Sequence, residues 1–281
     1  MSIVRDNIKK IGDKKMMKKS KYILLGILSL VFLSTLFFSF VNAVTPTGGS
    51  VTPGSPQTAP ADTAGNNSAF AGNTTFLGVT AYSTTQTWQG YFGNVSGTIQ
   101  LADASDNVIY NWTLAEPEGE VYASTNSSIT WGNIQCFNFT ANGTGGLGTA
   151  GSTNLGGTNL TVLESRFNIA SDDVDGVNET FNYTVGSDTH DQFFTANLQF
   201  SAGECLHTRT YNSAGTAASN QFEEVLLYEP VTSSVLFASL LEEGTLNGFN
   251  SQDNDFQMIV PEDGHATDTS ATSYYFFVEL E

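Results

Sequence analysis

The stretch SYYFFVELE, residues 273–281, places an apolar side chain at every second position. The residues that share its apolar side are Tyr274, Phe276, Val278 and Leu280. Successive side chains of a β-strand point to opposite faces, so this spacing predicts a strand with one buried face. The same alternation appears in NVIYNWTLA, residues 107–115, and in FFTANLQFS, residues 193–201. Both stretches are also expected to form strands.

Short apolar stretches separated by turn signals such as EPEG and PEDG recur along the rest of the chain. Many short strands at such spacing are typical of an antiparallel β-sandwich. We therefore expect an all-β fold, built as one large sandwich or as two docked sandwiches. The aromatic side of residues 107–115, with Trp112, is expected in the core. One short helix is expected near 159–168, because Leu160, Leu163 and Phe167 have helical spacing.

Residues 1–43 contain the three parts of an export signal. Eight of the ten basic residues lie in positions 1–21, and an apolar run from Ile23 to Phe40 follows. Val41 and Ala43 then match the small-residue pattern of a cleavage site. The alternative is an uncleaved anchor, because the run of 18 residues reaches the lower limit for a membrane span. Both interpretations place the chain after residue 43 outside the cell.

The chain after residue 43 contains no lysine and is strongly acidic. It keeps two basic residues, Arg166 and Arg209, against 26 acidic ones, so its formal net charge is −24. Nucleic-acid binding needs a basic surface and is excluded. Membrane contact is expected only through the N-terminal segment, if that segment stays uncleaved. High salt, divalent cations or acid would each weaken the repulsion among the carboxylates.

The cysteine positions bear on the number of domains. Residues 44–68 are rich in Thr, Pro, Gly and Ser and predict a linker before an acidic sandwich domain at 69–281. Cys136 and Cys205 are the only cysteines, and an even count in an exported chain favours a disulfide. This disulfide would bridge the glycine-rich segment 142–158. One folded unit, or two tightly docked sandwiches, is therefore expected.

The acidic turn SDDVDGVNE, residues 171–179, is the metal candidate. Carboxylates at alternate positions of a tight turn can converge on one calcium ion. The proposed ligands are Asp172, Asp173, Asp175 and Glu179. The match to a calcium loop is incomplete, because its first position would be Ser171 and its twelfth would be Asn182. A metal-free acidic turn is the alternative, and no cofactor other than calcium is expected.

Ten Asn-x-Ser/Thr sequons lie before residue 183 and none lies after it. Glycosylated asparagines must face solvent, and alternation turns some of these residues away from apolar faces. The glycosylation sites predicted on this basis are Asn94, Asn111, Asn138 and Asn182. Trp88 and Trp131 lie near turns, so an exposed position on a sugar-stacking surface is expected for both.

Several stretches together resemble an uncharacterised family of secreted archaeal cell-surface proteins whose function is unknown. They are TWQGYFGNVSGTI, YNWTLAEPEGEVYAS, DDVDGVNETF, FEEVLLYEP and VPEDGH. The resemblance covers about residues 80–281. It implies a location at the archaeal cell surface and brings no catalytic residues with it.

The sequence favours a structural role over an enzymatic one. The hydrolase motifs HExxH and GxSxG are absent, and the nearby Glu118 and Glu120 are ordinary for a turn in an acidic protein. We expect a non-enzymatic, secreted or cell-surface structural protein, glycosylated and disulfide-linked. The alternatives are a carbohydrate-binding or adhesin module, stabilised by calcium, and then a secreted hydrolase. Its partners would be other surface proteins or glycans.

Overall fold

The alternating stretch at the end of the chain becomes a strand of the main sheet. The computed structural model of the protein describes residues 45–114, 116–138, 160–170, 172–181, 189–263 and 271–280. Strand β13 covers Tyr275–Leu280. The side chains of Tyr274, Phe276 and Val278 pack against one core cluster, whereas Phe277 packs against a second cluster. The predicted division of this stretch between two faces is therefore confirmed.

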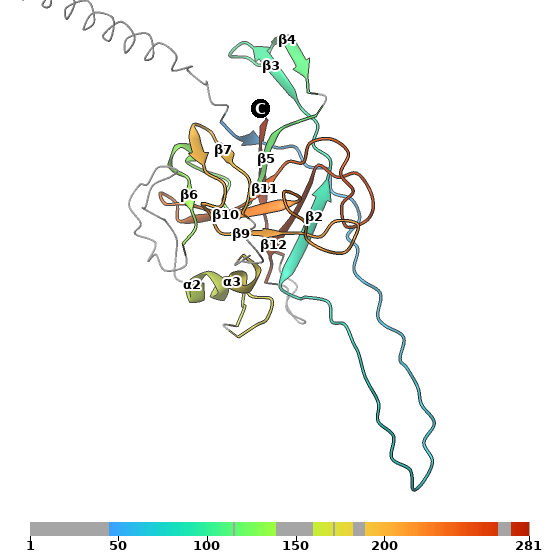
Figure 1. Cartoon of the computed structure of the whole chain (residues 1–281). Helices are drawn as coiled ribbons and strands as arrows, with labels where there is room; N and C mark the ends of the chain where they lie inside the picture. The colour runs from blue at the N-terminus through green and yellow to red at the C-terminus, as the bar shows by residue number, and fades with distance from the viewer. Residues whose placement is uncertain are drawn as a thin grey trace, which may run out of the picture. The chain divides into compact units, whose positions relative to one another are not determined.

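The main sheet has seven strands, and all its pairs are antiparallel (Figure 1). Its first five strands, from one edge inward, are β1 (Thr47–Gly48), β13, β5 (Gly119–Ser124), β11 (Ser234–Leu240) and β10 (Glu223–Glu229). The short strands β6 (Gln135–Cys136) and β9 (His207–Arg209) both pair with the outer side of β10. Every residue of β10 and β11 is buried. This burial on both faces explains why their sequences are apolar runs without strict alternation.

One face of the main sheet is covered by helices and a small sheet. The covering elements are α2 (Leu160–Ser165), α3 (Val177–Thr180), β2 (Trp88–Gly93) and β12 (Phe256–Pro261). Leu226 and Phe237 of the main sheet pack there with Leu163, Val177 and Met258. A buried side chain of this size contributes about 1.5–3 kcal/mol, so this cluster is a major source of stability.

The other face of the main sheet is covered by a hairpin and a single helical turn. These elements are β7 (Phe193–Thr195), β8 (Leu198–Phe200) and the 3₁₀ turn η1 (Trp131–Asn133). Phe193 stacks on Phe200 with their ring centroids 4.8 Å apart, and both rings pack against Leu227 and Leu236 of the sheet. The main sheet is therefore buried on both sides.

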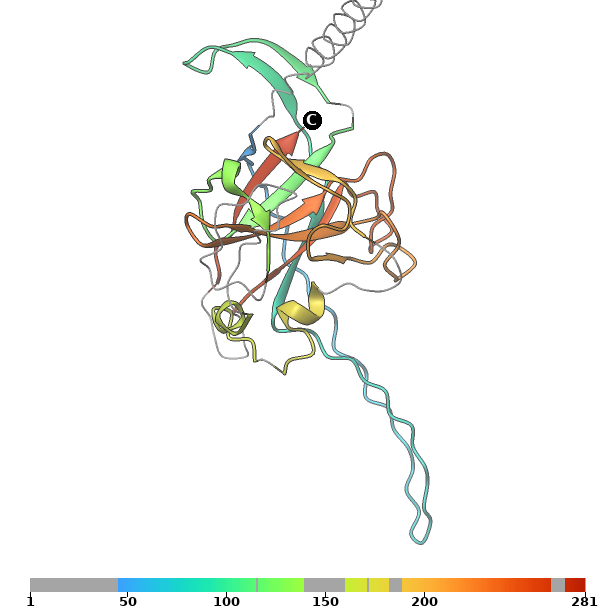
Figure 2. The ribbon, with the colours of Figure 1, turned by 60° about the vertical axis from the view of Figure 1, so that its left-hand side comes forward.

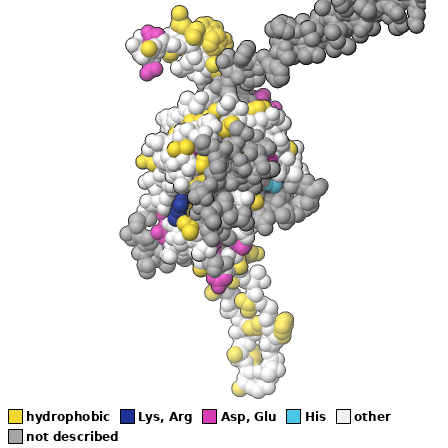
Figure 3. All heavy atoms as spheres, turned by 90° about the vertical axis from the view of Figure 1, so that its left-hand side faces the viewer, with side chains coloured by type: hydrophobic (Ala, Val, Ile, Leu, Met, Phe, Trp, Pro, Cys, Tyr) yellow, Lys and Arg dark blue, Asp and Glu magenta, His cyan; other side chains and the backbone are white. Residues whose placement is uncertain are grey.

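A second hairpin projects from this body. It consists of β3 (Thr98–Ala102) and β4 (Val108–Thr113), which pair with each other alone. All of β4 is exposed, and so is all of β3 except its partly exposed first residue. In Figure 3 hydrophobic side chains gather on this projection.

A long excursion of the chain separates β1 from β2. Every residue from Ser50 to Gln86 is exposed, and the segment contains no helix or strand. Figures 1 and 2 show it as two limbs that run out from the body and back, side by side. We call residues 50–86 the arm.

The structure confirms the all-β class and changes several details. Helix α2 lies within the predicted segment 159–168, but the expectation of a single helix was wrong, because α3 follows in the acidic turn. Residues 193–201 form a hairpin and not one strand, since the chain reverses at Ala196, where φ is +53°. The sheets other than the main one have two strands each in the described part of the chain, so the sandwich stays a prediction.

The predicted segment boundaries can be compared with the fold. Strand β1 lies inside the predicted linker 44–68, and residues 69–86 belong to the arm. The segment from Ala43 to Glu281 forms one compact unit. None of the described helices is long and apolar enough to cross a membrane. The apolar run Ile23–Phe40 lies outside the described residues.

Candidate functional site

A cavity of about 250 Å³ lies at one end of the main sheet, beside the segment that leads into β7. Its apolar wall includes Phe193, Phe194 and Leu240. The carboxylates that line it are Glu118, Glu120, Asp191, Glu223, Glu242 and Glu243. The ends of β5, β10 and β11 bring these residues together from distant parts of the sequence. We call this cavity the acidic pocket.

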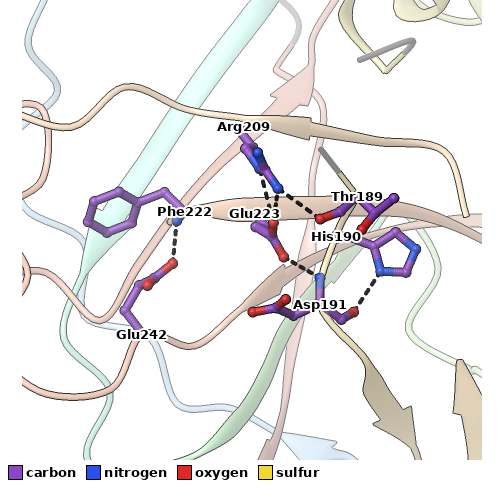
Figure 4. A network of polar contacts seen from close by, with 7 residues as sticks. All are labelled: Thr189, His190, Asp191, Arg209, Phe222, Glu223 and Glu242. Carbon is purple, nitrogen blue, oxygen red and sulfur yellow. Dashed lines mark hydrogen bonds and ion pairs between the residues drawn. The ribbon is translucent and has the colours of Figure 1, made fainter. Parts of the chain in front are cut away.

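Arg209 is the counter-ion of the acidic pocket (Figure 4). Its Nη2 and Nε atoms donate to Glu223 Oε1 at 2.6 Å and 3.0 Å, and both side chains are buried. Nη2 also donates to the carbonyl oxygen of Thr189 at 2.8 Å, while Glu223 Oε2 accepts the N–H of Asp191 at 2.6 Å. Burial raises the pKa of Glu223, although the Asp191 and Arg209 contacts oppose this rise. One of the two arginines beyond residue 43 is therefore buried and neutralises an internal carboxylate.

Glu242 provides the titratable group of the acidic pocket. Its Oε1 accepts the N–H of Phe222, a residue with a φ of +47° (Figure 4). Burial raises the pKa of Glu242 to about 7, and repulsion by Glu223 and Asp191 adds to this effect. The carboxyl group is therefore about half protonated at neutral pH. The chemistry available here is the binding and release of a proton.

His190 links the pocket wall to the disulfide. Its Nε2 accepts the N–H of Cys205 at 2.9 Å, and its Nδ1 lies 2.7 Å from the carbonyl oxygen of Asp191. The ring is therefore neutral, with its proton on Nδ1. Burial lowers the pKa of His190, which favours the same neutral form. Both ring nitrogens are engaged in holding backbone, which is a structural role.

Tyr122 lies between two buried carboxyl groups next to the acidic pocket. Its hydroxyl is 3.2 Å from Glu120 Oε2 and 3.1 Å from Glu279 Oε2. Glu279 also accepts the N–H of Ala196 through both oxygens, at 2.9 Å and 3.0 Å. A phenol has one proton to donate. The hydroxyl also lies 3.1 Å from Thr195 Oγ1 and 3.2 Å from the carbonyl oxygen of Phe194, so it is shared among several acceptors.

The predicted calcium ligands are placed in and beside α3. Asp173 Oδ2 accepts the N–H of Ala170 at 2.7 Å, and Asp175 accepts the hydroxyl of Thr85. Asp172 and Glu179 are exposed. Within the described ranges, no group of three or more His, Cys, Asp or Glu has the arrangement of a metal site. Calcium binding by this turn stays a prediction.

The two tryptophans predicted to stack on sugars are partly buried and packed against other aromatic rings. Trp88 contacts Phe181, with the centroids 6.1 Å apart, and its Nε1 donates to the carbonyl oxygen of Asp175 at 2.6 Å. Trp131 packs between Tyr122 and Phe277. Both rings are less exposed than expected, and sugar stacking by them stays a prediction.

The placement of Trp112 in the core was wrong. Its side chain is 50% exposed and that of Tyr110 is 60% exposed, with the two ring centroids 4.9 Å apart. The alternation along β4 was read correctly, but the hairpin that carries it projects from the body. Tyr110 and Trp112 are therefore the exposed aromatic pair that sequence reasoning missed.

The predicted disulfide is confirmed. It joins Cys136 to Cys205 and thereby links β6 to the segment just before β9. Among the predicted glycosylation sites, Asn94 and Asn111 are exposed and Asn138 is partly exposed. Asn182 lies outside the described residues. Glycosylation at these positions stays a prediction.

Most of the acidic pocket was not found from the sequence. Asp191, Glu223 and Glu242 lie far apart along the chain and belong to no motif. The signal that was available was the pair of carboxylates inside the apolar run FEEVLLYE, residues 222–229, because a buried carboxylate needs a partner. Comparisons of the chain with family models, with curated proteins and with solved structures find no match.

Proposed function

We propose that this chain is a non-enzymatic, extracellular structural subunit that joins other proteins at the cell surface. The observation that carries this proposal is the arm. Folding normally removes apolar side chains from water, but Phe76 is 95% exposed and Val79 and Tyr82 are each 84% exposed. An extended segment with such side chains is suited to contact a partner.

The charge distribution supports the same role. Asp62 is the only charged residue between positions 45 and 102, whereas the rest of the chain holds nearly all the carboxylates. Acidic bodies repel one another, and the arm, which carries Asp62 as its single charge, can make contact while adding little to that repulsion. The buried Arg209–Glu223 pair and the disulfide stabilise the body that carries the arm.

A fractionation of the native cells tests this proposal. We expect the mature chain on the surface or in the medium, in complexes of higher mass than a monomer. Salt should strengthen these complexes, because it screens the repulsion between bodies. Recovery from the cytoplasm, or as a monomer from the cell surface at every salt concentration, would contradict the structural role.

A carbohydrate-binding role is the second candidate. The specific observation in its favour is the exposed pair of Tyr110 and Trp112, because aromatic faces stack on sugar rings. Sugar binding should change the tryptophan fluorescence of the chain, and Trp112→Ala should remove the change. A screen of surface glycans that leaves the fluorescence unaltered would exclude this candidate.

A further inference from the structure

The β3–β4 hairpin has one apolar face and one largely polar face, and Ile109 of β4 is also exposed. Residues directly opposite each other in an antiparallel pair lie on the same face. Ile99 pairs with Trp112 and Leu101 pairs with Tyr110, so these four side chains share a face. Gln100 pairs with Asn111 on the reverse side. A glycan on Asn111 would therefore leave the apolar face uncovered.

The β3–β4 hairpin needs a further strand or surface packed against its apolar face to be stable. An isolated two-stranded hairpin is marginally stable in water, and a third strand or a packed surface stabilises it. The exposed fractions of Leu101, Tyr110 and Trp112 are 54%, 60% and 50%. The apolar face is thus formed but uncovered within a single chain.

The arm contains an apolar segment that could cover the apolar face of the hairpin. Residues 74–83, TTFLGVTAYS, are rich in residues that favour strands, yet they pair with no strand in the structure. Phe76 and Tyr82 are six positions apart, an even offset, so an extended chain directs both side chains to one face. Ten extended residues span about 33 Å, which exceeds the length of β3 or β4.

One chain cannot easily bring these two parts together. The arm ends just before β2, whose first residue is Trp88, and the β3–β4 hairpin follows the other end of β2 at Gly93. Figures 1 and 2 show the arm and the hairpin leaving the body on opposite sides. A contact between the arm and a hairpin is therefore more readily made between two copies.

The apolar contact area is that of a weak interface. An aromatic side chain offers about 150–250 Å², so Phe76, Tyr82, Tyr110 and Trp112 together expose about 600 Å². Ile99 and Leu101 share the apolar face of the hairpin and are also exposed. The combined apolar area stays below the roughly 1,000 Å² of a stable interface, so we expect assembly to depend on the concentration of the chain.

We infer that residues 74–83 of the arm of one copy cover the apolar face of the β3–β4 hairpin of the next copy. This inference rests on the proposed structural function and names its partner. The two surfaces differ, so the contact is head-to-tail and repeats along a chain of copies. It closes into a ring or continues as a filament, depending on the rotation between neighbours.

Complementation between two variants tests the inference. The arm variant carries Phe76→Ser and Tyr82→Ser, and the hairpin variant carries Tyr110→Ser and Trp112→Ser. Each should stay monomeric in sedimentation velocity at concentrations about 30-fold above those at which the secreted wild-type chain associates, since aromatic anchors dominate such interfaces. An equimolar mixture should form a dimer and grow no further, because it retains one intact arm and one intact hairpin. Asn111→Gln, on the polar face, is the matched control and should assemble like the wild type.

A photo-reactive phenylalanine analogue at position 82 should cross-link to residues 98–113 of another copy. Amine-reactive reagents are unsuitable, because no lysine follows residue 21. Assembly of either variant at the wild-type concentration would overturn the inference. A cross-link from position 82 to another part of the body would also overturn the inference. Glycan binding by the hairpin, with a wild-type chain that stays monomeric, would overturn it as well. Surface complexes that persist in these variants would contradict this interface alone and leave the structural function intact.

Discussion

Replacing Glu242 by glutamine should remove part of the pH dependence of stability. The pKa of this carboxyl rises from 4.5 to about 7 on folding. Between these two pH values the folded state binds more protons than the unfolded state, so the free energy of unfolding falls as the pH rises. At 1.36 kcal/mol per pH unit the full loss would be about 3 kcal/mol, and partial exposure of the side chain reduces our expectation to about 2 kcal/mol.

Glutamine keeps an oxygen that can accept the N–H of Phe222 and carries no charge. The wild type should therefore lose about 2 kcal/mol relative to Glu242→Gln between pH 4.5 and pH 7, and the difference should stay constant above that range. Denaturant unfolding at several pH values and fixed ionic strength measures this. Glu243→Gln, at the exposed neighbouring position, is the matched control. Parallel stability curves for the wild type and Glu242→Gln would refute the assignment.

Three further predictions concern the disulfide, the ion pair and calcium. Native protein should show no free thiol on labelling, and removing the Cys136–Cys205 disulfide should reduce stability by about 4 kcal/mol, because the bond closes a loop of 69 residues. Arg209→Met should reduce stability at pH 7 by about 3–5 kcal/mol by leaving Glu223 buried without its cation; adding Glu223→Gln should restore much of this loss in thermal melts. Calcium should raise the melting temperature more than sodium at equal ionic strength if residues 172–179 bind it, and amide replacements of the aspartates there should abolish the difference.

The sequence predicted which side chains share a strand face better than it predicted which faces are buried. Residues 273–281 alternate as expected, but both faces of β13 contact a core cluster and Glu279 is fully buried. The alternation in residues 193–201 continues through a tight turn at Ala196, and side-chain pattern alone cannot distinguish that turn from a continuous strand. Alternation in β4 fixed which side chains share a face, but it could not fix whether the body or another molecule covers that face.

The acidic pocket depends on information that a single sequence does not hold. Glu223 and Arg209 are neighbours because β9 and β10 pair, and Glu242 joins them because it follows β11. Predicting such a site requires the strand order, which local patterns do not determine. The cysteines were more informative, since a disulfide between the only two cysteines has a single possible connectivity.

The buried carboxyl groups of the body affect the electrophoretic behaviour of the folded molecule. The formal charge of −24 after residue 43 counts every carboxyl as ionised. Burial raises the pKa of Glu224 and of Glu242, and both shifts reduce the negative charge of the folded chain. Folding at mildly acidic pH must then take up protons from the buffer, because the same groups are ionised in the unfolded chain. The measured heat of folding will consequently vary with the ionisation enthalpy of the buffer.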